Sequence, residues 1–295
     1  FVKDRGIPSL GIEPTAGTAE AARAKGIEVV VEFFGFGLAD RLVAEGRAAD
    51  LMAANNVLAH VPDINDFVAG FARLLKPQGV ATFEFPHLLK LVEDCQFDTV
   101  YHEHFSYLSL AAVDTIFGKN GLSVFDVEEL STHGGSLRVF AQRSDGGRRE
   151  ATAAVGNLRA AELAAGVTSA AYYTGFQTRA ETVKDDLLAF LLDARRSRKR
   201  VVGYGAAAKG NTLLNFAGVR PDLLSWVVDR NPAKKDKFLP GSRIPVVGED
   251  RLHTERPDYV LVLPWNLRAE ISEQLGYVRR WGGRLVTAVP HLEVV

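Results

Sequence analysis

The densest group of side chains able to do acid-base chemistry lies between residues 100 and 107. The run reads Val100-Tyr101-His102-Glu103-His104-Phe105-Ser106-Tyr107. Imidazole, carboxylate and phenol groups this close together supply both bases and hydrogen-bond donors, which proton abstraction next to a carbonyl requires. The run therefore predicts a catalytic site.

Two other interpretations of this run stay open. His102 and His104, at positions i and i+2, could share one face of a strand and bind a metal ion, although the sequence offers no third ligand. Either histidine could instead be satisfied by a backbone carbonyl and have a structural role. We predict catalysis first and assign no metal ligand.

Other polar residues follow apolar runs that are predicted to be strands. Glu13 ends one run, Asn55, Asn56 and His60 follow another, and His87 follows a third. Ligands of open α/β sheets bind beyond the carboxyl ends of the strands, where a carboxylate can accept hydrogen bonds from ribose hydroxyls. These residues are candidate ligand contacts; a solvated glutamate, an asparagine turn and structural histidines are the alternatives.

A second candidate site is the run Gly203-Tyr204-Gly205-Ala206-Ala207-Ala208-Lys209-Gly210. Glycines between a buried strand and a helix let backbone amides approach a phosphate, and Lys209 can neutralise its charge. Asp229 ends the next expected strand about 24 residues after Gly205, near the roughly 20 expected for a ribose-binding acid. The spacing departs from the usual dinucleotide and Walker patterns, so a tight strand-to-helix turn is the alternative.

The elements that position these residues alternate between strand and helix. Apolar runs bounded by Gly, Pro or Asp predict strands at 9–13, 27–33, 49–54 and 80–85. Stretches of helical period lie between them at 18–25 and 63–75. This alternation predicts an α/β fold with a parallel sheet covered by helices.

The pattern changes after residue 85. A helix is predicted at 108–119, followed by an antiparallel pair of strands at 122–129 and 136–142 on the sheet edge. The polar stretch 143–150 is the predicted boundary between domains at 1–145 and 146–295. The second domain begins with a long Ala-rich helical region at 151–200. It continues with a second α/β series, whose strands are predicted at 200–204, 224–229, 259–263 and 285–289.

Composition excludes several classes of protein. The 295 residues carry 35 Lys and Arg against 36 Asp and Glu, so no positive field favours nucleic acid or a membrane surface. Cys95 is the single cysteine, so neither an internal disulfide nor a cysteine-based zinc site can form within this chain. No apolar run approaches the roughly 20 residues that span a bilayer. We expect a cytoplasmic protein.

Several stretches together resemble the S-adenosylmethionine-dependent sugar C-methyltransferases that act on nucleotide-linked deoxysugars. The resemblance spans essentially the whole chain, and the joint presence of Tyr-His-Glu-His-Phe and Gly-Tyr-Gly-Ala-x-Ala-Lys-Gly makes it specific. The stretches that carry it are 54–63, 83–87, 97–108, 132–138, 203–212, 229–232 and 239–241.

The resemblance implies a three-part architecture. A zinc module built on cysteines is followed by a class I, Rossmann-like methyltransferase domain and a smaller Rossmann-like α/β domain that holds the sugar nucleotide. The zinc cysteines and the glycine-rich turn of the first methyltransferase strand would precede Phe1. The methyltransferase domain at 1–145 is therefore expected to be amino-terminally incomplete, with zinc only in a module outside this chain.

The resemblance also implies roles for individual residues. His104 is the implied base that removes a proton from the carbon beside a keto group, with Tyr101, Glu103 and His60 around the sugar. The implied S-adenosylmethionine contacts are Glu13, Phe33, Asn55 and Asn56. The implied sugar-nucleotide contacts are Tyr204, Gly205, Ala208, Lys209, Asn211 and Asp229. Because side chains alternate along a strand, Tyr101, Glu103 and His104 can serve one site only from a loop or a helix start.

The sequence thus predicts methyl transfer from S-adenosylmethionine to a carbon next to the keto group of a nucleotide-diphosphate-linked deoxysugar. The alternatives are a nicotinamide-dependent oxidoreductase that uses the Gly203–Gly210 turn, and a sugar-nucleotide-binding pseudoenzyme. The sequence does not predict the sugar, the carbon, the nucleotide or the oligomeric state.

Overall fold

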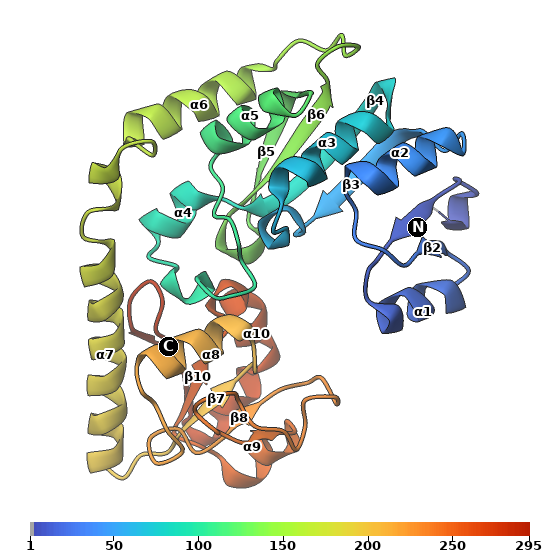
Figure 1. Ribbon diagram of the computed structural model, residues 1–295. Helices are drawn as coiled ribbons and strands as arrows, with labels where there is room; N and C mark the ends of the chain where they lie inside the picture. The colour runs from blue at the N-terminus through green and yellow to red at the C-terminus, as the bar shows by residue number, and fades with distance from the viewer. Residues whose placement is uncertain (1–2) are drawn as a thin grey trace. The chain divides into compact units, whose positions relative to one another are not determined.

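The chain divides into two compact units, each assembled from separate segments. A computed structural model describes residues 3–295 (Figure 1). Unit 1 comprises the chain up to Phe85 with Phe105–Leu130 and Leu137–Ala164, and unit 2 comprises Pro86–His104, Ser131–Ser136 and Ala165–Val295. The division into domains at 1–145 and 146–295, which the sequence predicts, stays a prediction.

Unit 1 begins with a small parallel pair of strands. Its elements are η1 (Lys3–Arg5), β1 (Leu10–Ile12), α1 (Ala16–Ala24), β2 (Glu28–Val30) and α2 (Phe36–Ala44). β1 and β2 pair in parallel, with Leu10 opposite Glu28. Leu38, Ala39 and Leu42 of α2 form a buried cluster against which apolar residues of both strands pack. The alternation of strands and helices expected for this part of the chain is confirmed.

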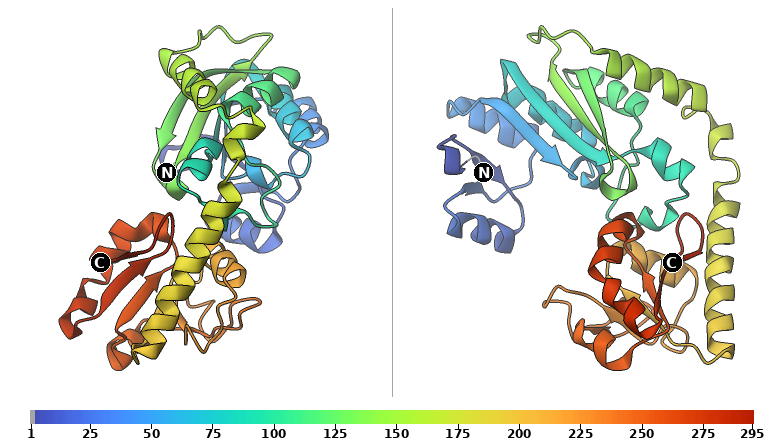
Figure 2. Two further views of the ribbon diagram at one scale, coloured as in Figure 1. Left: turned by 90° about the vertical axis from the view of Figure 1, so that its left-hand side faces the viewer. Right: turned by 180° about the vertical axis from the view of Figure 1, so that it is seen from behind.

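The larger sheet of unit 1 has the strand order β3-β4-β6-β5. Its elements are β3 (Ala49–Asn55), η2 (Leu58–His60), α3 (Ile64–Leu74), β4 (Leu75–Pro86), α5 (Leu110–Lys119), β5 (Leu122–Leu130), β6 (Ser136–Arg143) and α6 (Ala153–Ala165). β3 and β4 are parallel, with Ala54 opposite Phe83. Helices α3 and α5 lie along this sheet, as Figures 1 and 2 show.

Aromatic side chains join α3 and α5 to this sheet. The Phe71 ring of α3 lies 4.5 Å from the Phe83 ring of β4, which lies 4.7 Å from the Phe117 ring of α5. Phe83 is fully buried. Such tilted aromatic pairs stabilise a core beyond the area that they bury.

Unit 2 contains a six-stranded sheet with the order β12-β11-β10-β7-β8-β9. Its strands are β7 (Val201–Tyr204), β8 (Val227–Val228), β9 (Val246–Val247), β10 (Tyr259–Val262), β11 (Arg284–Thr287) and β12 (Glu293–Val294). Its helices are α4 (Leu88–Glu93), η3 (Phe97–Thr99), η4 (Thr132–Gly134), η5 (Ala170–Tyr173), α7 (Phe176–Arg196), α8 (Ala208–Phe216), α9 (Asp250–Glu255), η6 (Trp265–Leu267), α10 (Arg268–Gln274) and η7 (Gly276–Trp281).

The strand order of unit 2 reverses at β7. From β7 the chain first builds β8 and β9 on one side, and then returns to place β10 on the other side. β7 pairs in parallel with both β8 and β10. Reversal points of this kind are where open α/β sheets bind ligands, because the loops leaving the two central strands diverge there.

Helix α7 runs beside this sheet (Figure 2). It packs on the sheet through one apolar stripe. Its buried residues Ala180, Val183, Leu187, Leu191 and Ala194 recur every three or four positions. This spacing places them on one face of the helix, as expected for a helix lying against a core. The same buried cluster includes Val201 and Leu261 of the sheet.

Several features differ from the sequence-based expectations. The strands expected at 9–13 and 27–33 do not join those expected at 49–54 and 80–85 in one sheet, because β1 and β2 form a separate two-stranded sheet. The helical region predicted at 151–200 is broken into α6, η5 and α7, because Gly166 and Gly175 adopt positive φ angles of 82° and 86°. Helix α2 was not predicted. Its N-terminus is capped from another helix, since the Phe36 N–H donates to Asp66 Oδ1 at 3.2 Å.

Among residues 3–295, no helix is both long and apolar enough to cross a membrane.

Glu162 provides a test of how unit 1 is held together. This α6 residue is 2% exposed, and its carboxylate accepts from the first amides of α5, Leu110 N at 2.6 Å and Ala111 N at 2.9 Å. Removing the carboxylate leaves the buried N–H donors at the N-terminus of α5 without an acceptor. Glu162→Ala should therefore lower the free energy of unfolding by about 2 to 3 kcal/mol. Urea denaturation measures this change.

The adjacent residue Leu163 is 76% exposed and supplies the control. Leu163→Ala should change the free energy of unfolding by less than about 0.5 kcal/mol. Equal effects of the two substitutions would show that the capping carboxylate contributes nothing specific.

Candidate active site

His104 lies in a turn and loop, as expected from the alternation argument. Residues 101–103 form a turn and residues 104–107 have no regular structure. The His104 backbone N–H donates to Tyr101 O at 3.0 Å, and the two rings lie 4.3 Å apart at 30°. The turn thus places the phenol ring of Tyr101 against the imidazole of His104.

The imidazole of His104 is also held by the backbone. Its Nδ1 lies 2.8 Å from the carbonyl oxygen of Thr99. Because a carbonyl oxygen can only accept, Nδ1 must carry the proton of the neutral ring. Nε2 then keeps its lone pair, and His104 is held in the tautomer that a general base at Nε2 requires.

The turn that provides this carbonyl is itself buried. In η3, Asp98 is fully buried and Thr99 is 6% exposed. Asp98 Oδ2 accepts from Trp265 Nε1 at 2.8 Å, across 167 residues of sequence. Thr99 Oγ1 donates to Gln96 O at 2.7 Å, which holds the turn internally. The support of His104 therefore reaches the segment that follows β10.

Asp98 and Lys209 influence each other's protonation. Burial raises the pKa of Asp98 to about 6, although the Trp265 hydrogen bond and the Lys209 charge act in the opposite direction. Burial also lowers the pKa of Lys209, and the attraction of Asp98 partly offsets that effect. A half-buried ammonium group therefore lies within electrostatic reach of a buried carboxylate.

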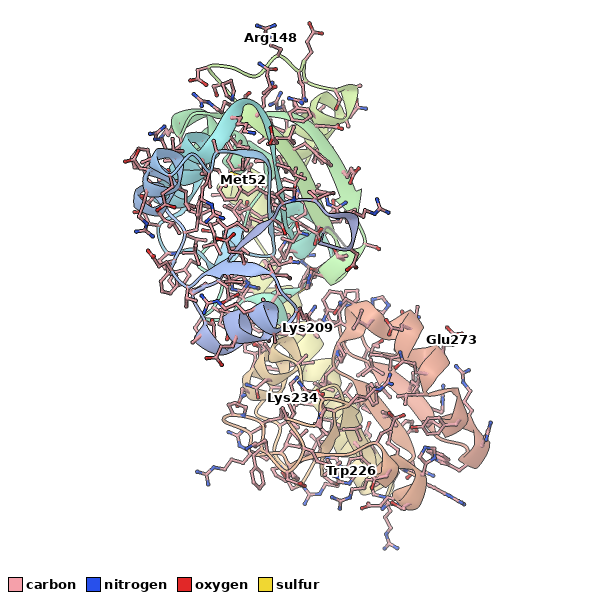
Figure 3. All side chains as sticks on the ribbon, turned by 90° about the vertical axis from the view of Figure 1, so that its right-hand side faces the viewer. Met52, Arg148, Lys209, Trp226, Lys234 and Glu273 are labelled. Carbon is pink, nitrogen blue, oxygen red and sulfur yellow. The ribbon has the colours of Figure 1, made fainter. Side chains whose placement is uncertain are left out.

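Lys209, labelled in Figure 3, lies at the start of α8. Residues of the loop after β10 hold its side chain. Its Nζ donates to Asn266 Oδ1 at 2.8 Å and lies 4.5 Å from the centre of the Trp265 ring. Lys209 follows β7 whereas Trp265 and Asn266 follow β10. The side chains therefore meet at the point where the strand order reverses.

The glycine turn after β7 is tight for steric reasons. Gly205 has a φ of 88°, and a Cβ atom there would lie 2.5 Å from Pro264 Cδ. The turn is closed by Asp229, whose Oδ2 accepts from Ala206 N at 2.8 Å and from Lys234 Nζ at 3.2 Å. Lys234, labelled in Figure 3, also donates to Ala206 O at 2.9 Å.

Asp229 is therefore engaged in holding the turn. Its second oxygen, Oδ1, accepts from Asn231 N at 2.8 Å. The hydroxyls of a dinucleotide ribose would have to compete with these internal bonds. This arrangement disfavours the oxidoreductase interpretation of the turn.

Three other predicted substrate contacts lie beside the glycine turn. Tyr204 ends β7 and is 5% exposed, Ala208 begins α8 and is exposed, and Asn211 lies in the first turns of α8. Within residues 3–295, the Tyr204 hydroxyl and Asn211 Oδ1 are buried polar atoms without a hydrogen-bond partner. Such atoms gain stability when a ligand supplies the missing partner.

The predicted cofactor contacts belong to unit 1 and follow its strands. Glu13 follows β1, and its backbone N–H donates to Val30 O of β2 at 3.0 Å. Phe33 follows β2, and its side chain is 83% exposed. Asn55 ends β3, and Asn56 has a φ of 55° with a buried Oδ1 that has no partner in the described chain.

His60 ends the short helix η2 in unit 1. The carbonyl of the preceding residue, Ala59, accepts from Phe105 N at 2.8 Å and from Ser106 N at 3.2 Å. The chain just after His104 is thus bonded next to His60 within unit 1. The shared role of His60 with His104 remains a prediction.

The part of the chain that the structure describes holds no group of three or more His, Cys, Asp or Glu side chains arranged to bind a metal ion.

Sequence reasoning missed three residues of this site: Asp98, Trp265 and Asn266. Asp98 lies two residues before the run that contains His104, but an acidic residue in such a short segment gives no sign of burial. Trp265 and Asn266 follow the strand next to β7, which is where ligand-binding residues of α/β sheets are expected. That position is the signal that could have identified them.

Comparison with known proteins assigns the two halves of the chain to families. Residues 5–127 match a methyltransferase domain, and residues 131–290 match the C-methyltransferase C-terminal domain. C-methyltransferase NovU of Streptomyces niveus is 33% identical over 286 residues, which cover 97% of this chain and 68% of that protein. The chain belongs to the C-methyltransferase family, and it is an S-adenosylmethionine-dependent C-methyltransferase.

Two of the solved structures with similarity to this chain match about half of it. The PH0226 protein of Pyrococcus horikoshii OT3 is 16% identical, with a TM-score of 0.39, over 48% of this chain and 74% of its own. Magnesium protoporphyrin IX methyltransferase of Synechocystis PCC 6803, solved with bound SAH, is 16% identical, with a TM-score of 0.37, over 48% of this chain and 66% of its own.

The buried carboxyl of Asp98 predicts a pH dependence of stability. Since its folded pKa of about 6 exceeds the unfolded value, the folded protein binds a proton between about pH 4 and pH 6 that the unfolded chain has released. Raising the pH through this window therefore lowers the free energy of unfolding, by roughly 3 kcal/mol for this carboxyl. Asp98→Asn should lack this loss when urea denaturation is followed from pH 4 to 7.

Asp185, whose side chain is 70% exposed, supplies the matched control. Asp185→Asn should retain the pH dependence of the unmodified protein. If Asp98→Asn also retains it, Asp98 does not titrate in this window.

Proposed function

We propose that this enzyme methylates the carbon next to the keto group of a nucleotide-diphosphate-linked deoxysugar. The observation that carries the proposal is the 2.8 Å contact of His104 Nδ1 with the Thr99 carbonyl. It leaves Nε2 as the basic nitrogen, which is what removal of a proton from such a carbon needs. A carbon acid next to a ketone gives the nucleophilic carbon that C-methylation requires.

In the proposed reaction, His104 Nε2 takes the proton from the carbon, and the electrons of the broken C–H bond move into the carbonyl to form an enolate. A neutral imidazole is a weak base for such a proton, so the enolate oxygen needs a hydrogen-bond donor. The phenol of Tyr101, packed on the same imidazole, is the candidate. Glu103 belongs to the same turn and would orient the sugar or a neighbouring imidazole.

S-adenosylmethionine, when bound, supplies a methyl group on a sulfonium that the enolate carbon can attack. The residues of unit 1 fit its binding. The exposed ring of Phe33 offers a face for a purine, and Glu13 offers carboxylate oxygens for ribose hydroxyls. Asn55 and the unpartnered Oδ1 of Asn56 lie at the end of β3, where they can accept from polar groups of the cofactor.

The diphosphate is assigned to the turn between β7 and α8. Lys209 supplies a positive charge at the helix N-terminus, and Gly205 allows the backbone to approach an anion. Tyr204 and Asn211 offer unpartnered polar atoms for other parts of the substrate. These features favour recognition of the nucleotide diphosphate by the carboxyl-terminal domain.

The role of His104 can be tested with nucleotide-diphosphate-linked 4-keto-deoxysugars and radiolabelled S-adenosylmethionine, using the full-length protein. His104→Gln should lower kcat about 100- to 10,000-fold because general base catalysis is lost. In deuterium oxide, exchange of the proton next to the ketone should be lost in the same variant.

His291→Gln is the control, because His291 is a largely exposed histidine that pairs with Glu293. It should leave kcat unchanged. If His104→Gln also retains turnover, His104 is not the base. If the unmodified protein binds the sugar nucleotides but transfers no methyl group to any of them, the pseudoenzyme alternative is favoured.

Cofactor choice gives a second test. S-adenosylhomocysteine should raise the Tm of the full-length protein in a concentration-dependent way, because it binds the folded state alone. NADH should leave the Tm unchanged, since Asp229 is engaged by the turn itself. Stabilisation by NADH without stabilisation by S-adenosylhomocysteine would contradict the proposed function.

A further inference from the structure

The three consecutive residues of η3 each contact a different part of unit 2. The Phe97 ring lies 5.2 Å from the Phe216 ring at the end of α8. Asp98 Oδ2 accepts from Trp265 Nε1, and the Thr99 carbonyl holds His104 Nδ1. One short turn therefore connects the histidine to α8 and to the loop after β10.

We propose that Asp98 is a positioning residue for methyl transfer: its hydrogen bond to Trp265 holds the turn that presents the Thr99 carbonyl to His104. Asp98 does not itself contact the reacting atoms. It acts on the tautomer and the direction of the imidazole. This inference rests on the proposed function in so far as His104 is the base.

The burial of Asp98 argues against a role in packing alone. Asp98 is fully buried, and within residues 3–295 its Oδ1 has no hydrogen-bond partner. A buried carboxylate that is only partly hydrogen-bonded destabilises a fold relative to an apolar residue of similar size. What the carboxylate provides here is a directed bond that an apolar side chain cannot make.

Trp265 is a rigid partner for this bond. A Cβ atom added to Gly134 would lie 2.5 Å from Trp265 Cη2, so the glycine packs directly against the indole ring. Gln96 Nε2 donates to Gly134 O at 2.7 Å, which fixes the loop on that side of the ring. The Lys209 ammonium lies 4.5 Å from the ring centre. With the ring held in this way, the Trp265 N–H has a defined direction.

The same contacts link the proposed base to the proposed anion site. Lys209 is bonded to Asn266, next to Trp265, and is attracted by the Asp98 carboxylate. The residue that would neutralise the diphosphate and the turn that holds His104 therefore both contact the loop after β10. Because Lys209 keeps its bond to Asn266 when Asp98 is removed, loss of Asp98 should disturb the chemical step more than the binding of substrate.

The experiment compares Asp98→Ala, Asp98→Asn and Trp265→Phe in the full-length enzyme. Asp98→Ala and Trp265→Phe should each lower kcat about 10- to 100-fold, with KM for the sugar nucleotide within about twofold of the unmodified enzyme. Asp98→Asn keeps an acceptor for the indole N–H and should retain kcat within about threefold. The double variant Asp98→Ala with Trp265→Phe should lose no more than either single variant, because both remove one interaction.

Nitrogen-15 NMR of the histidine side chains provides a readout that does not depend on turnover. At about pH 8, where imidazoles are mainly neutral, His104 should show a protonated Nδ1 and an unprotonated Nε2. In Asp98→Ala and Trp265→Phe, the two nitrogens should shift towards each other as the second tautomer becomes populated.

Trp281→Phe is the matched control, because Trp281 Nε1 donates to Pro257 O at 3.0 Å in the same unit. Trp281 packs against a different buried cluster from Trp265. It should change neither kcat nor the His104 resonances. The proposal is overturned if Trp281→Phe lowers kcat as much as Trp265→Phe, or if Asp98→Ala leaves both kcat and the tautomer unchanged. If Asp98→Ala does not fold, the comparison of Trp265→Phe with Trp281→Phe decides the question.

The two proposals fail in different ways. If His104→Gln retains turnover, His104 is not the base. The nitrogen resonances of His104 in Asp98→Ala still test whether Asp98 positions the imidazole. If His104 is confirmed as the base but its tautomer is unchanged in Asp98→Ala and Trp265→Phe, only the positioning role of Asp98 is wrong.

Discussion

The proposed placement of His104 depends on one hydrogen bond, from Trp265 Nε1 to the buried carboxylate of Asp98 at 2.8 Å. It joins η3, about a third of the way along the sequence, to the loop after β10. A charge-assisted bond of this kind is strong when solvent is excluded, but the carboxylate that accepts it is costly to bury. The raised pKa of Asp98 shows that cost, because burial outweighs the Trp265 bond and the Lys209 charge together.

The topology of the sheet explains why these residues can meet at all. Because β7 and β10 are parallel neighbours, the loops at their carboxyl ends leave the same edge of the sheet. The loop after β7 must be tight, since Gly205 lies against Pro264 of the other loop. Asp229 and Lys234 then close the β7 turn from within, which leaves Lys209 and its neighbours as the polar groups that a ligand can engage.

Much of the fold was predictable from local signals. Asp63 and Ser109 cap α3 and α5 by accepting from Asp66 N and Ala112 N, and both helices were expected at these places. The loop at residues 101–107 followed from the alternation of side chains along a strand. Helix α2 was missed because its sequence continues an aromatic, strand-like run and its first amide is capped by Asp66, 30 residues away.

The sequence by itself determined the family, the α/β alternation and the residues proposed to bind a diphosphate and to move a proton, because these depend on composition and spacing along the chain. It did not determine which of those residues are held in working geometry. The tautomer of His104 depends on a carbonyl fixed by a buried turn, and that turn is fixed by a bond across 167 residues. Only the tertiary structure decides such a contact, since burial and long-range hydrogen bonding have no local signature.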